Sequence, residues 1–551
     1  MKYSFTLAVF LLVTTVHAVT IEEINDKPSS REKNFLIWQY LRQDINATQA
    51  SEAFYQVDTV NERFLFDYAK KSDEAEIRYT AECMQKISTD LMNIQEDDCL
   101  YLALSPIKAQ HLQSYERELI ATRLGERFGD VQWLRTMNHN SHFSPFSDAA
   151  SSLKLFLISG VQYRAEHFNH TIDNEILGQL TTLKGFNHFV YLSATEQKLD
   201  KVQESLSNVS GGVYDSQTHF YLGINALKFK RPDNALFHLR EARLKALSPM
   251  ERDKTIFWLY RITQEETLLK ELAESLDINM YTLWAKEKLS METENYFTTL
   301  PTPDKGGFKG DNPFEWNLLH KELMETPPEK LYEIVERYDG EDSLAVQAYM
   351  IERVYQPYIH NFTMPYDQYM TTLSTDKKAM LYALMRQETR MIPGLISRSF
   401  ALGLMQIMPF NVDSISKIHP MKVTSYYDMF NPQYGIAYSI EHMKHIEATL
   451  YNPVLMAYAY NGGIGFTKRL LLSGGYFNVG EHEPFMSMEL VGNAESREYG
   501  KRVLANYVIY KKILGESVSI AAIFDSLTQP SLSDYFRAEE LKKSLVLNQS
   551  E

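Results

Sequence analysis

Between about residue 30 and residue 290, apolar residues recur every three or four positions, in segments of about ten to twenty residues separated by short polar breaks. This spacing places the apolar side chains along one face of a helix. Runs of alternating apolar and polar residues, which are typical of half-buried strands, are almost absent. Successive helix pairs of this kind stack on one another, so the pattern predicts an α-superhelical solenoid.

One stretch in this region, YLGINALKFKRPDNALFHLREARLKALSP, has the spacing of a repeat. Small and apolar residues fall at positions that resemble one tetratricopeptide repeat: Leu222, Gly223, Ala226, Ala235, Leu239 and Ala242. Small side chains there let two helices pack closely. An ordinary helical hairpin would make the same contacts, so both interpretations stay open.

The helical pattern is interrupted at LPTPDKGGFKGDNP, Leu300 to Pro313, which holds three prolines and three glycines. Such a segment cannot be helical and predicts a boundary or a long loop. We therefore divide the chain into a signal peptide (1–18), a solenoid (19–300), a linker with connecting helices (301–363), a catalytic domain (364–515) and a C-terminal tail (516–551).

The first residues, MKYSFTLAVFLLVTTVHAVT, predict a secretory signal peptide. An apolar run from Phe5 to Val13 follows a lysine, with Val16 and Ala18 as small residues before the cut. A buried N-terminal helix is the alternative, disfavoured by charges that begin at Glu22. No cysteine follows the run, and no later segment approaches the ~18 apolar residues of a membrane span. We expect a periplasmic protein without a lipid anchor or membrane span.

Composition narrows the class of protein. The chain has 551 residues, 44% hydrophobic and 23% charged, which is typical of a folded protein of several domains. Its net charge of −15 argues against a nucleic-acid partner. Cys83 and Cys99 are the only cysteines, and an oxidising compartment favours a disulfide between them. Two buried free thiols remain the alternative, because sequence does not fix the geometry.

Candidate chemistry begins on the segment STDKKAMLYALMRQETR, a predicted helix starting near Ser374 or Thr375. Leu381, Leu384 and Met385 share one face, and Glu388 is the next position of this apolar stripe. Removal from water raises the pKa of a carboxyl group, so Glu388 is a candidate general acid. In the alternative, Glu388 bends into water or pairs with a neighbouring arginine, Arg386 or Arg390.

Two further segments present polar groups in apolar surroundings. In SRSFALGLMQIMP, Gln406 lies between Met405 and Ile407, and a buried amide of this kind orients a ligand unless the protein's own backbone satisfies it. In PVLMAYAYNGGIG, a predicted helix ends at Tyr460 and Asn461 before a group of glycines. Alone, this second segment indicates only a helix C-terminus.

Together these segments resemble the soluble lytic murein transglycosylases. The family's R-Q-E-S motif resembles RQET at Arg386 to Thr389, its serine nine residues after the glutamate matches Ser397, and its G-L-M-Q-I-M-P is present at Gly403 to Pro409. Its A-Y-N-A-G resembles AYNGG at Ala459 to Gly463, and its E-T-R-x-Y-V resembles ESREYG at Glu495 to Gly500. Three motifs in the family's order form a specific pattern.

The resemblance covers roughly residues 364 to 515. It implies an all-α fold, with an N-terminal α-superhelical solenoid followed by a lysozyme-like α-helical catalytic domain. The chain departs from the family at Val491, Gly492 and Asn493, at Gly435 and Ile436, and at Thr389 and Arg390. These changes concern the wall of the peptide-binding region and the substrate preference.

The resemblance also implies the roles of the site residues. Glu388 would be the single catalytic acid and base. The substrate-binding residues would be Ser397, Gln406, Met408, Tyr460, Asn461 and Glu495. By this carry-over, Tyr460 and Asn461 orient Glu388 or the substrate's acetamido group, and Glu495 raises the pKa of Glu388. A salt bridge from Glu495 to Arg497 would be the structural alternative.

The implied substrate is the glycan strand of peptidoglycan, cleaved with formation of 1,6-anhydromuramic acid ends during cell wall turnover. Other cell wall enzymes are candidate partners. No cofactor or metal is expected, because His442 and His445 lack a third ligand in sequence. Two rival functions remain: a lysozyme-like hydrolase with Glu495 as second carboxylate, and a non-catalytic scaffold that binds peptidoglycan.

Overall fold

The computed structural model describes residues 18–139, 142–144, 148–299, 307–338, 340–355 and 360–548. The predicted signal peptide lies outside the described residues except for Ala18. In the part of the chain that is described, no helix combines the length and apolar character needed to cross a membrane.

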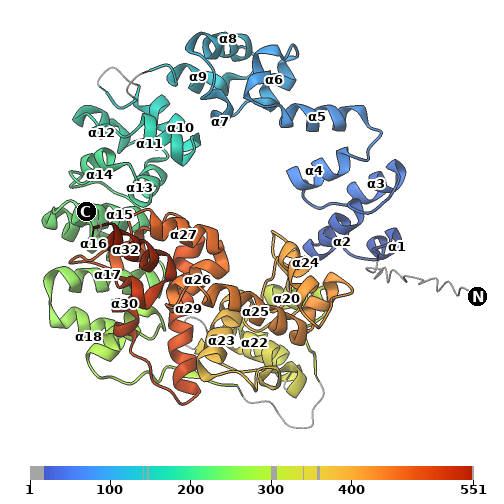
Figure 1. Ribbon diagram of the computed structural model, residues 1–551, viewed down its shortest axis with the longest axis vertical. Helices are drawn as coiled ribbons and strands as arrows, with labels where there is room; N and C mark the ends of the chain where they lie inside the picture. Colours follow the sequence, from blue (N-terminus) through green and yellow to red (C-terminus); the bar gives the residue numbers. More distant parts are fainter. Residues whose placement is uncertain are drawn as a thin grey trace, which may run out of the picture.

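The N-terminal half is a succession of short helices that arcs around the molecule (Figure 1). The described region predicted to be a solenoid contains α1 (Ile21–Asn25), α2 (Arg31–Leu41), α3 (Ala47–Phe54), α4 (Glu62–Ala69), α5 (Ala75–Gln85), α6 (Asp97–Ala103), α7 (Pro106–Ala109), α8 (Ser114–Gly125), α9 (Trp133–Thr136), α10 (Ala149–Ile158), α11 (Val161–His167), α12 (Asn174–Leu180), α13 (Phe186–Thr195), α14 (Asp200–Leu206), α15 (Ser216–Lys228), α16 (Pro232–Leu244), α17 (Pro249–Thr263), α18 (Glu266–Glu274) and α19 (Met280–Lys288), with 3₁₀ turns at Ser88–Asn93 and Gly129–Gln132. Most apolar positions of these helices are buried between neighbours.

The predicted repeat forms the helical hairpin α15–α16. A Cβ added at Gly223 would lie 2.9 Å from the Leu239 side chain, so the absence of a side chain permits the close approach of the two helices. Ala235 and Ala242 are buried in the same contact. The hairpin has the packing expected at the repeat positions.

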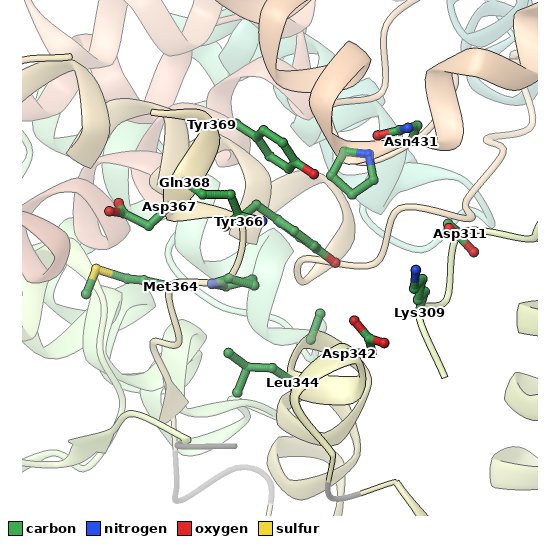
Figure 2. A pocket seen from close by; sticks show the side chains of 13 residues that line it. Lys309, Asp311, Asp342, Leu344, Met364, Tyr366, Asp367, Gln368, Tyr369 and Asn431 are labelled. Carbon is green, nitrogen blue, oxygen red and sulfur yellow. The ribbon is translucent and has the colours of Figure 1, made fainter. Parts of the chain in front are cut away.

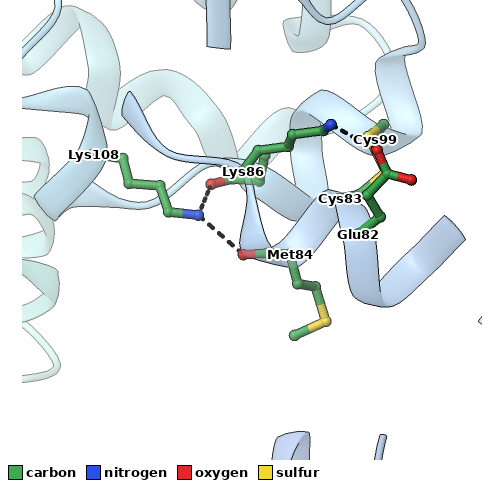
Figure 3. The surroundings of a disulfide bond; sticks show 7 residues. Glu82, Cys83, Met84, Lys86, Cys99 and Lys108 are labelled. Carbon is green, nitrogen blue, oxygen red and sulfur yellow. Dashed lines mark hydrogen bonds and ion pairs between the residues drawn. A yellow bond between two sulfur atoms is a disulfide. The ribbon is translucent and has the colours of Figure 1, made fainter. Parts of the chain in front are cut away.

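A disulfide bond joins Cys83 at the end of α5 to Cys99 in α6, with the two Cα atoms 5.0 Å apart (Figure 3). The open choice between a disulfide and two free thiols is thus resolved in favour of the disulfide. Lys108 strengthens this junction by donating hydrogen bonds to the carbonyl oxygens of Met84 and Ala103. The bond therefore closes the connection between two successive solenoid helices.

A connecting region leads to the catalytic domain. Its elements are β1 (Tyr296–Phe297), α20 (Pro313–Glu325), a 3₁₀ turn at Pro328–Lys330, α21 (Leu331–Arg337), a 3₁₀ turn at Glu341–Ser343, α22 (Leu344–Tyr355) and β2 (His360–Asn361). The two short strands pair in parallel, with Tyr296 opposite His360. Residues 300–306 of the predicted loop lie outside the described residues, and the remainder is non-helical up to Pro313.

The catalytic domain and the tail are also helical. They comprise a 3₁₀ turn at Asp367–Tyr369, α23 (Thr375–Thr389), α24 (Pro409–Ile418), a 3₁₀ turn at Tyr426–Phe430, α25 (Pro432–Glu447), α26 (Pro453–Gly462), α27 (Ile464–Leu472), α28 (Phe485–Leu490), α29 (Ala494–Ile513), α30 (Ile520–Leu527), α31 (Pro530–Ser533) and α32 (Tyr535–Asn548). The predicted all-α class, with a solenoid before a helical catalytic domain, is confirmed.

The arc closes on itself, because the first helices touch the catalytic domain (Figure 1). Arg31 of α2 donates a hydrogen bond of 3.0 Å to the carbonyl oxygen of Ile396. The rings of Phe35 and Trp38 pack 5.3 and 5.5 Å from the ring of Phe400. Helix α2 therefore packs against the segment that contains Ile396 and Phe400, more than 350 residues later in the sequence.

Candidate active site

Helix α23 positions the predicted acid. The Ser374 side chain accepts a hydrogen bond from the Lys377 backbone N–H at the start of the helix, which satisfies one of the free N–H groups there. The helix ends at Arg390, which has a left-handed backbone conformation with φ 53°. Glu388 lies in the last turn, after the buried residues Leu381, Leu384 and Met385. The apolar stripe predicted from sequence is present.

The neighbouring arginines do not pair with Glu388. Arg386 is buried and donates to Glu352 of α22 at 2.6 Å, and Arg390 donates to the same carboxylate at 3.0 Å. Arg386 also donates to the Asn361 carbonyl oxygen and to the Asn506 side chain. The alternative in which Glu388 pairs with an arginine is therefore wrong, because Glu352 occupies both guanidinium groups.

Within the described residues, Glu388 has a single hydrogen-bond partner, the hydroxyl of Tyr499 on α29, which donates to Oε1 at 2.7 Å. Burial raises the pKa of Glu388 to about 8. The hydrogen bond from Tyr499 opposes this shift, and the negative charge of Glu495 adds to it. Glu388 therefore holds its proton near neutral pH, as a general acid requires.

Helix α26 presents Tyr460 and Asn461 at its C-terminal end, as predicted. The Tyr460 hydroxyl donates to the Met405 carbonyl oxygen at 2.8 Å and lies 3.1 Å from the Ser439 hydroxyl. Burial, followed by the charge of Glu388, raises the pKa of Tyr460. Tyr460 thus lies beside the acid but directs its proton to the backbone of the adjacent loop.

Asn461 connects the end of α26 to the start of α29. Its amide nitrogen donates to Glu495 Oε1 at 3.0 Å, and its amide oxygen accepts from the Ser496 hydroxyl at 2.7 Å. Arg497 instead contacts Glu498, at 3.3 Å, and the carbonyl oxygen of Val491. The alternative of a salt bridge between Glu495 and Arg497 is therefore not found among the described residues.

The loop between α23 and α24 forms a tight hairpin, with bridges from Leu402 to Ile396 and Ile407. Gly403 has φ 68°, and a Cβ there would lie 2.0 Å from the Met429 carbonyl oxygen. Glycine is therefore required at this position. Thr389, one of the departures from the family pattern, donates to the Leu404 carbonyl oxygen at 3.0 Å and ties the hairpin to α23.

Ser397 and Gln406 contribute mainly to the shape of this loop. The Ser397 hydroxyl oxygen accepts from the backbone N–H groups of Ser399 and Ala401. The Gln406 amide donates to the carbonyl oxygens of Leu395 and Gly403, at 3.2 and 2.8 Å. The protein's own backbone thus bonds to the Gln406 amide nitrogen, which was the alternative to ligand binding. Its amide oxygen has no partner in the described part of the chain.

Sequence reasoning missed Tyr499 and Glu352. Tyr499 lies four residues after Glu495 on α29, and this i, i+4 spacing puts both side chains on one helix face. That spacing is a signal from which Tyr499 could have been found. Glu352 lies outside the motifs, on a connecting helix, and no local pattern relates it to Arg386. Met408 precedes α24 as its N-terminal cap residue and is partly exposed.

The cavity in Figure 2, of about 420 Å³, is separate from the predicted site residues. Lys309, Asp311, Tyr366 and Asn431 are among the residues that line it. The Tyr366 hydroxyl donates to the Met391 carbonyl oxygen, which follows α23. Among the described residues, no group of three histidine, cysteine or acidic side chains could hold a metal ion.

The geometry first defines the kind of site: a helical domain presents one carboxyl group that burial keeps protonated and that no cation pairs with among the described residues. Part of the chain also matches a known domain. Residues 366–475 match the transglycosylase SLT domain. This part of the chain is therefore a transglycosylase SLT domain, in agreement with the family resemblance of the three motifs.

Three solved structures are also similar to the chain. An inactive mutant of lytic transglycosylase Slt from Pseudomonas aeruginosa is 16% identical, with 91% of this chain and 84% of that chain covered and a TM-score of 0.48. The 70 kDa soluble lytic transglycosylase Slt70 from Escherichia coli is 14% identical, with 91% of each chain covered and a TM-score of 0.39. A complex of the 70 kDa soluble lytic transglycosylase with bulgecin A is 14% identical, with 90% and 83% covered and a TM-score of 0.44.

No curated protein matches the chain. The TM-scores of the three structures lie below 0.5, so the domain match and the geometry of the site, rather than these structures, carry the functional argument.

Proposed function

We propose that this protein is a periplasmic lytic transglycosylase that cleaves the β-1,4 bond between N-acetylmuramic acid and N-acetylglucosamine in peptidoglycan and leaves 1,6-anhydromuramic acid ends. The observation that carries this proposal is the state of Glu388. Burial raises its pKa to about 8, and no cation pairs with it among the described residues. A carboxyl group that is protonated at neutral pH can donate a proton to a leaving oxygen.

In the first step, Glu388 protonates the glycosidic oxygen that leaves C1 of N-acetylmuramic acid. The bond between C1 and this oxygen breaks, and the substrate's own acetamido group stabilises the positive charge that develops at C1. Substrate assistance of this kind takes the place of a second protein carboxylate. The Tyr499 hydroxyl, 2.7 Å from Oε1, then stabilises the Glu388 carboxylate that is left.

In the second step, the Glu388 carboxylate accepts the proton of the C6 hydroxyl group of the same sugar. The C6 oxygen forms a bond to C1 and closes the 1,6-anhydro ring. Glu388 is thereby returned to its protonated state, and no water is consumed. One group serves both steps because its raised pKa lies between the requirements of an acid and of a base near neutral pH.

The binding roles of the other predicted residues form part of the same proposal. The Ser397 hydroxyl and the free Gln406 amide oxygen would contact the N-acetyl group and the peptide-bearing portion of the substrate, and Met408 would line the sugar site. The hydrogen bonds of Tyr460 and Asn461 support a more indirect role than the resemblance implies. Tyr460 holds the loop at Met405, and Asn461 holds Glu495.

The proposed location rests on the sequence of residues 1–18 and on the disulfide between Cys83 and Cys99, a bond typical of oxidising compartments. The proposed biological role is turnover and remodelling of the cell wall. The proposed domain limits are those given in the sequence analysis, except that helix α22 is added to the catalytic domain. Helix α22 contributes Glu352 to the arginines of α23, so a catalytic fragment should begin before Leu344.

The test is a digestion of purified sacculi in water enriched with oxygen-18, followed by mass spectrometry of the fragments. We expect muropeptides that are lighter by one water than those of a lysozyme digest and that contain no oxygen-18 at C1. Reducing muramic acid ends that carry oxygen-18 would overturn the proposal in favour of the hydrolase, with Glu495 as its second carboxylate. An absence of fragments would favour the non-catalytic scaffold.

A further inference from the structure

A second polar cavity lies where the solenoid meets the catalytic domain. It has a volume of about 630 Å³, and residues of α13, α15, α17 and α29 line it. The predicted site residues are not part of its lining. Its cationic residues are Lys254, Arg497 and Arg502, and its acidic residues are Glu251 and Glu498.

Two of these cations, Lys254 and Arg502, make no direct ion pair with any described residue. Arg497 contacts Glu498 at 3.3 Å, and Glu498 also contacts Lys501. Lys254, by contrast, is partly buried and makes no direct hydrogen bond or ion pair with described residues, and its ammonium group lies 4.0 Å from the centre of the Phe220 ring. The charges of Glu489 and Glu498 act on it from a distance, yet burial still lowers its pKa. Exposed Arg502 likewise has no hydrogen-bond or ionic partner among them. An ammonium group that is partly removed from water is costly without a partner, and an anion in the cavity would offset that cost.

The arrangement of the helices adds to this positive potential. The cavity is lined by residues from the first turns of four helices: Asn187 and His188 of α13, Gln217 of α15, Met250 and Glu251 of α17, and Ala494 of α29. Each helix N-terminus carries a partial positive charge. Four such ends and two unpaired cations favour an anionic ligand.

The acidic and amide groups in the lining indicate which kind of anion fits the cavity, a phosphate or a carboxylate. Glu251 and Glu498 would repel a doubly charged phosphate more strongly than a singly charged carboxylate. The side-chain amides of Asn187 and Gln217 can bond to peptide groups. The lining therefore fits a carboxylate that is attached to a peptide.

Helix α29 links this cavity to the active site. At 100° per residue, Ala494, Arg497 and Glu498 lie on the face toward the cavity, whereas Glu495 and Tyr499 lie on the face toward Glu388. Arg502 lies between the two faces. A substrate that occupies the active site can thus place a second group in the cavity across the width of one helix.

We infer that this cavity binds a carboxylate of the peptide carried by the peptidoglycan substrate. This inference rests on the proposed function and extends it. Lys254 and Arg502 bind the carboxylate, and the four helix ends contribute to the field that attracts it. The contact adds binding energy at a distance from the cleaved bond and therefore favours glycan that carries peptides over glycan that has lost them.

The kinetic test uses the full-length protein and two substrates prepared from the same sacculi, namely glycan strands with their peptides and strands stripped of peptides by an amidase. Lys254→Met keeps the apolar part of the lysine against Phe220, and Arg502→Gln changes an exposed side chain that folding does not require. The matched controls are Lys270→Met and Arg240→Gln, at exposed solenoid positions outside the cavity.

Each cavity variant should raise KM for peptide-bearing strands by about tenfold or more, the loss expected for one charge-assisted hydrogen bond. Its kcat should be unchanged, and its KM for stripped strands should equal that of the parent. The control variants should match the parent on both substrates. An equal loss on both substrates, or no loss on either, overturns the inference and leaves the proposed function intact.

A binding measurement separates failure of the inference from failure of the proposed function, because it needs no cleavage. Calorimetry would compare a disaccharide carrying an acidic peptide, the same compound with its carboxylates amidated, and inorganic phosphate. We expect at least tenfold weaker binding after amidation, and a similar weakening by Lys254→Met. Phosphate binding that equals and displaces the acidic peptide would overturn the assignment to a carboxylate.

Discussion

Two glutamates near the last turn of α23, the buried Glu352 of α22 and the partly buried Glu388, have different partners. Glu352 accepts hydrogen bonds from Arg386 and Arg390, at 2.6 and 3.0 Å. Glu388 has no cation beside it among the described residues and one hydroxyl partner, Tyr499. Both carboxyl groups are largely removed from water. The partner, rather than burial alone, therefore decides whether such a carboxyl group is suited to a structural or a chemical role.

The difference also explains the RQET sequence. Arg386 and Arg390 flank the acid in sequence but turn toward α22, where Glu352 satisfies both. Arg386 is held on that side by the Asn361 carbonyl oxygen and the Asn506 side chain as well. A guanidinium group beside Glu388 would instead lower the pKa of that carboxyl group. The two cations nearest to Glu388 in sequence are therefore paired with Glu352 and do not contact Glu388, the proposed acid.

The largest expected effect is that of Glu388→Gln. Glutamine keeps the volume but can neither donate nor accept the proton, so cleavage should fall by about 10⁴-fold or more, the upper end for general acid and base catalysis. The rate of fragment release from sacculi measures this. Glu447→Gln, which removes a surface partner of Lys377, is the control and should retain the parent rate.

The same variant makes a prediction about stability. The native protein holds the Glu388 proton up to a pH of about 8, whereas an unfolded chain loses it near 4.5. The parent should therefore lose stability as pH rises between these values, and Glu388→Gln should lack this loss. Denaturant unfolding at several pH values measures it. For the activity prediction, a Glu388→Gln variant that cleaves sacculi within tenfold of the parent rate would contradict the role of Glu388.

The second effect concerns the structural glutamate. Arg386→Met leaves Glu352 buried with only the partly exposed Arg390 and the more distant His360, at 3.9 Å, and should lower the free energy of unfolding by about 3–5 kcal/mol. Arg390→Met is the matched control and should cost about 1 kcal/mol or less, because this side chain is partly exposed. Urea titration gives both values. Adding Glu352→Gln to Arg386→Met should recover part of the loss, and an unchanged double variant would argue against the pair.

The smallest effect compares two neighbours of Glu388. The Tyr499 hydroxyl lowers the pKa of Glu388 and the charge of Glu495 raises it. Because activity requires the protonated acid, Tyr499→Phe should move the basic limb of the kcat/KM profile to higher pH and Glu495→Gln should move it to lower pH. Each shift should be about one pH unit. Shifts of the same sign in both variants would show that these neighbours do not set the pKa.

Local periodicity was sufficient to predict α23, its cap at Ser374 and the place of Glu388 at the end of an apolar stripe. It was sufficient because a helix face depends on spacing within a few residues. The helical solenoid and the break before Pro313 follow from the same kind of signal. The pairing of Cys83 with Cys99 remained open, because spacing alone does not determine the distance between two Cα atoms.

The partners of the site residues could not be predicted in this way. Glu352 lies 34 residues before Arg386, and Tyr499 lies 111 residues after Glu388, so both contacts depend on how the helices pack. The Gln406 amide was predicted to orient a ligand or to bond to the backbone. In the structure, the tight turn at Gly403 brings two carbonyl oxygens of the loop to the Gln406 amide nitrogen, which bonds to both. For this nitrogen, the prediction of a bond to the backbone is the correct one.

The most direct test is a titration of the Glu388 carboxyl group itself. Infrared difference spectra between the parent and Glu388→Gln isolate the carboxyl band of this residue as pH changes. Because Glu388, unlike Glu352, has no cation beside it among the described residues, we predict that the band disappears with a pKa of about 8. A band that titrates near the ordinary value of 4.5 would contradict it, because Glu388 would then be ionised at neutral pH and unable to donate the proton that begins the reaction.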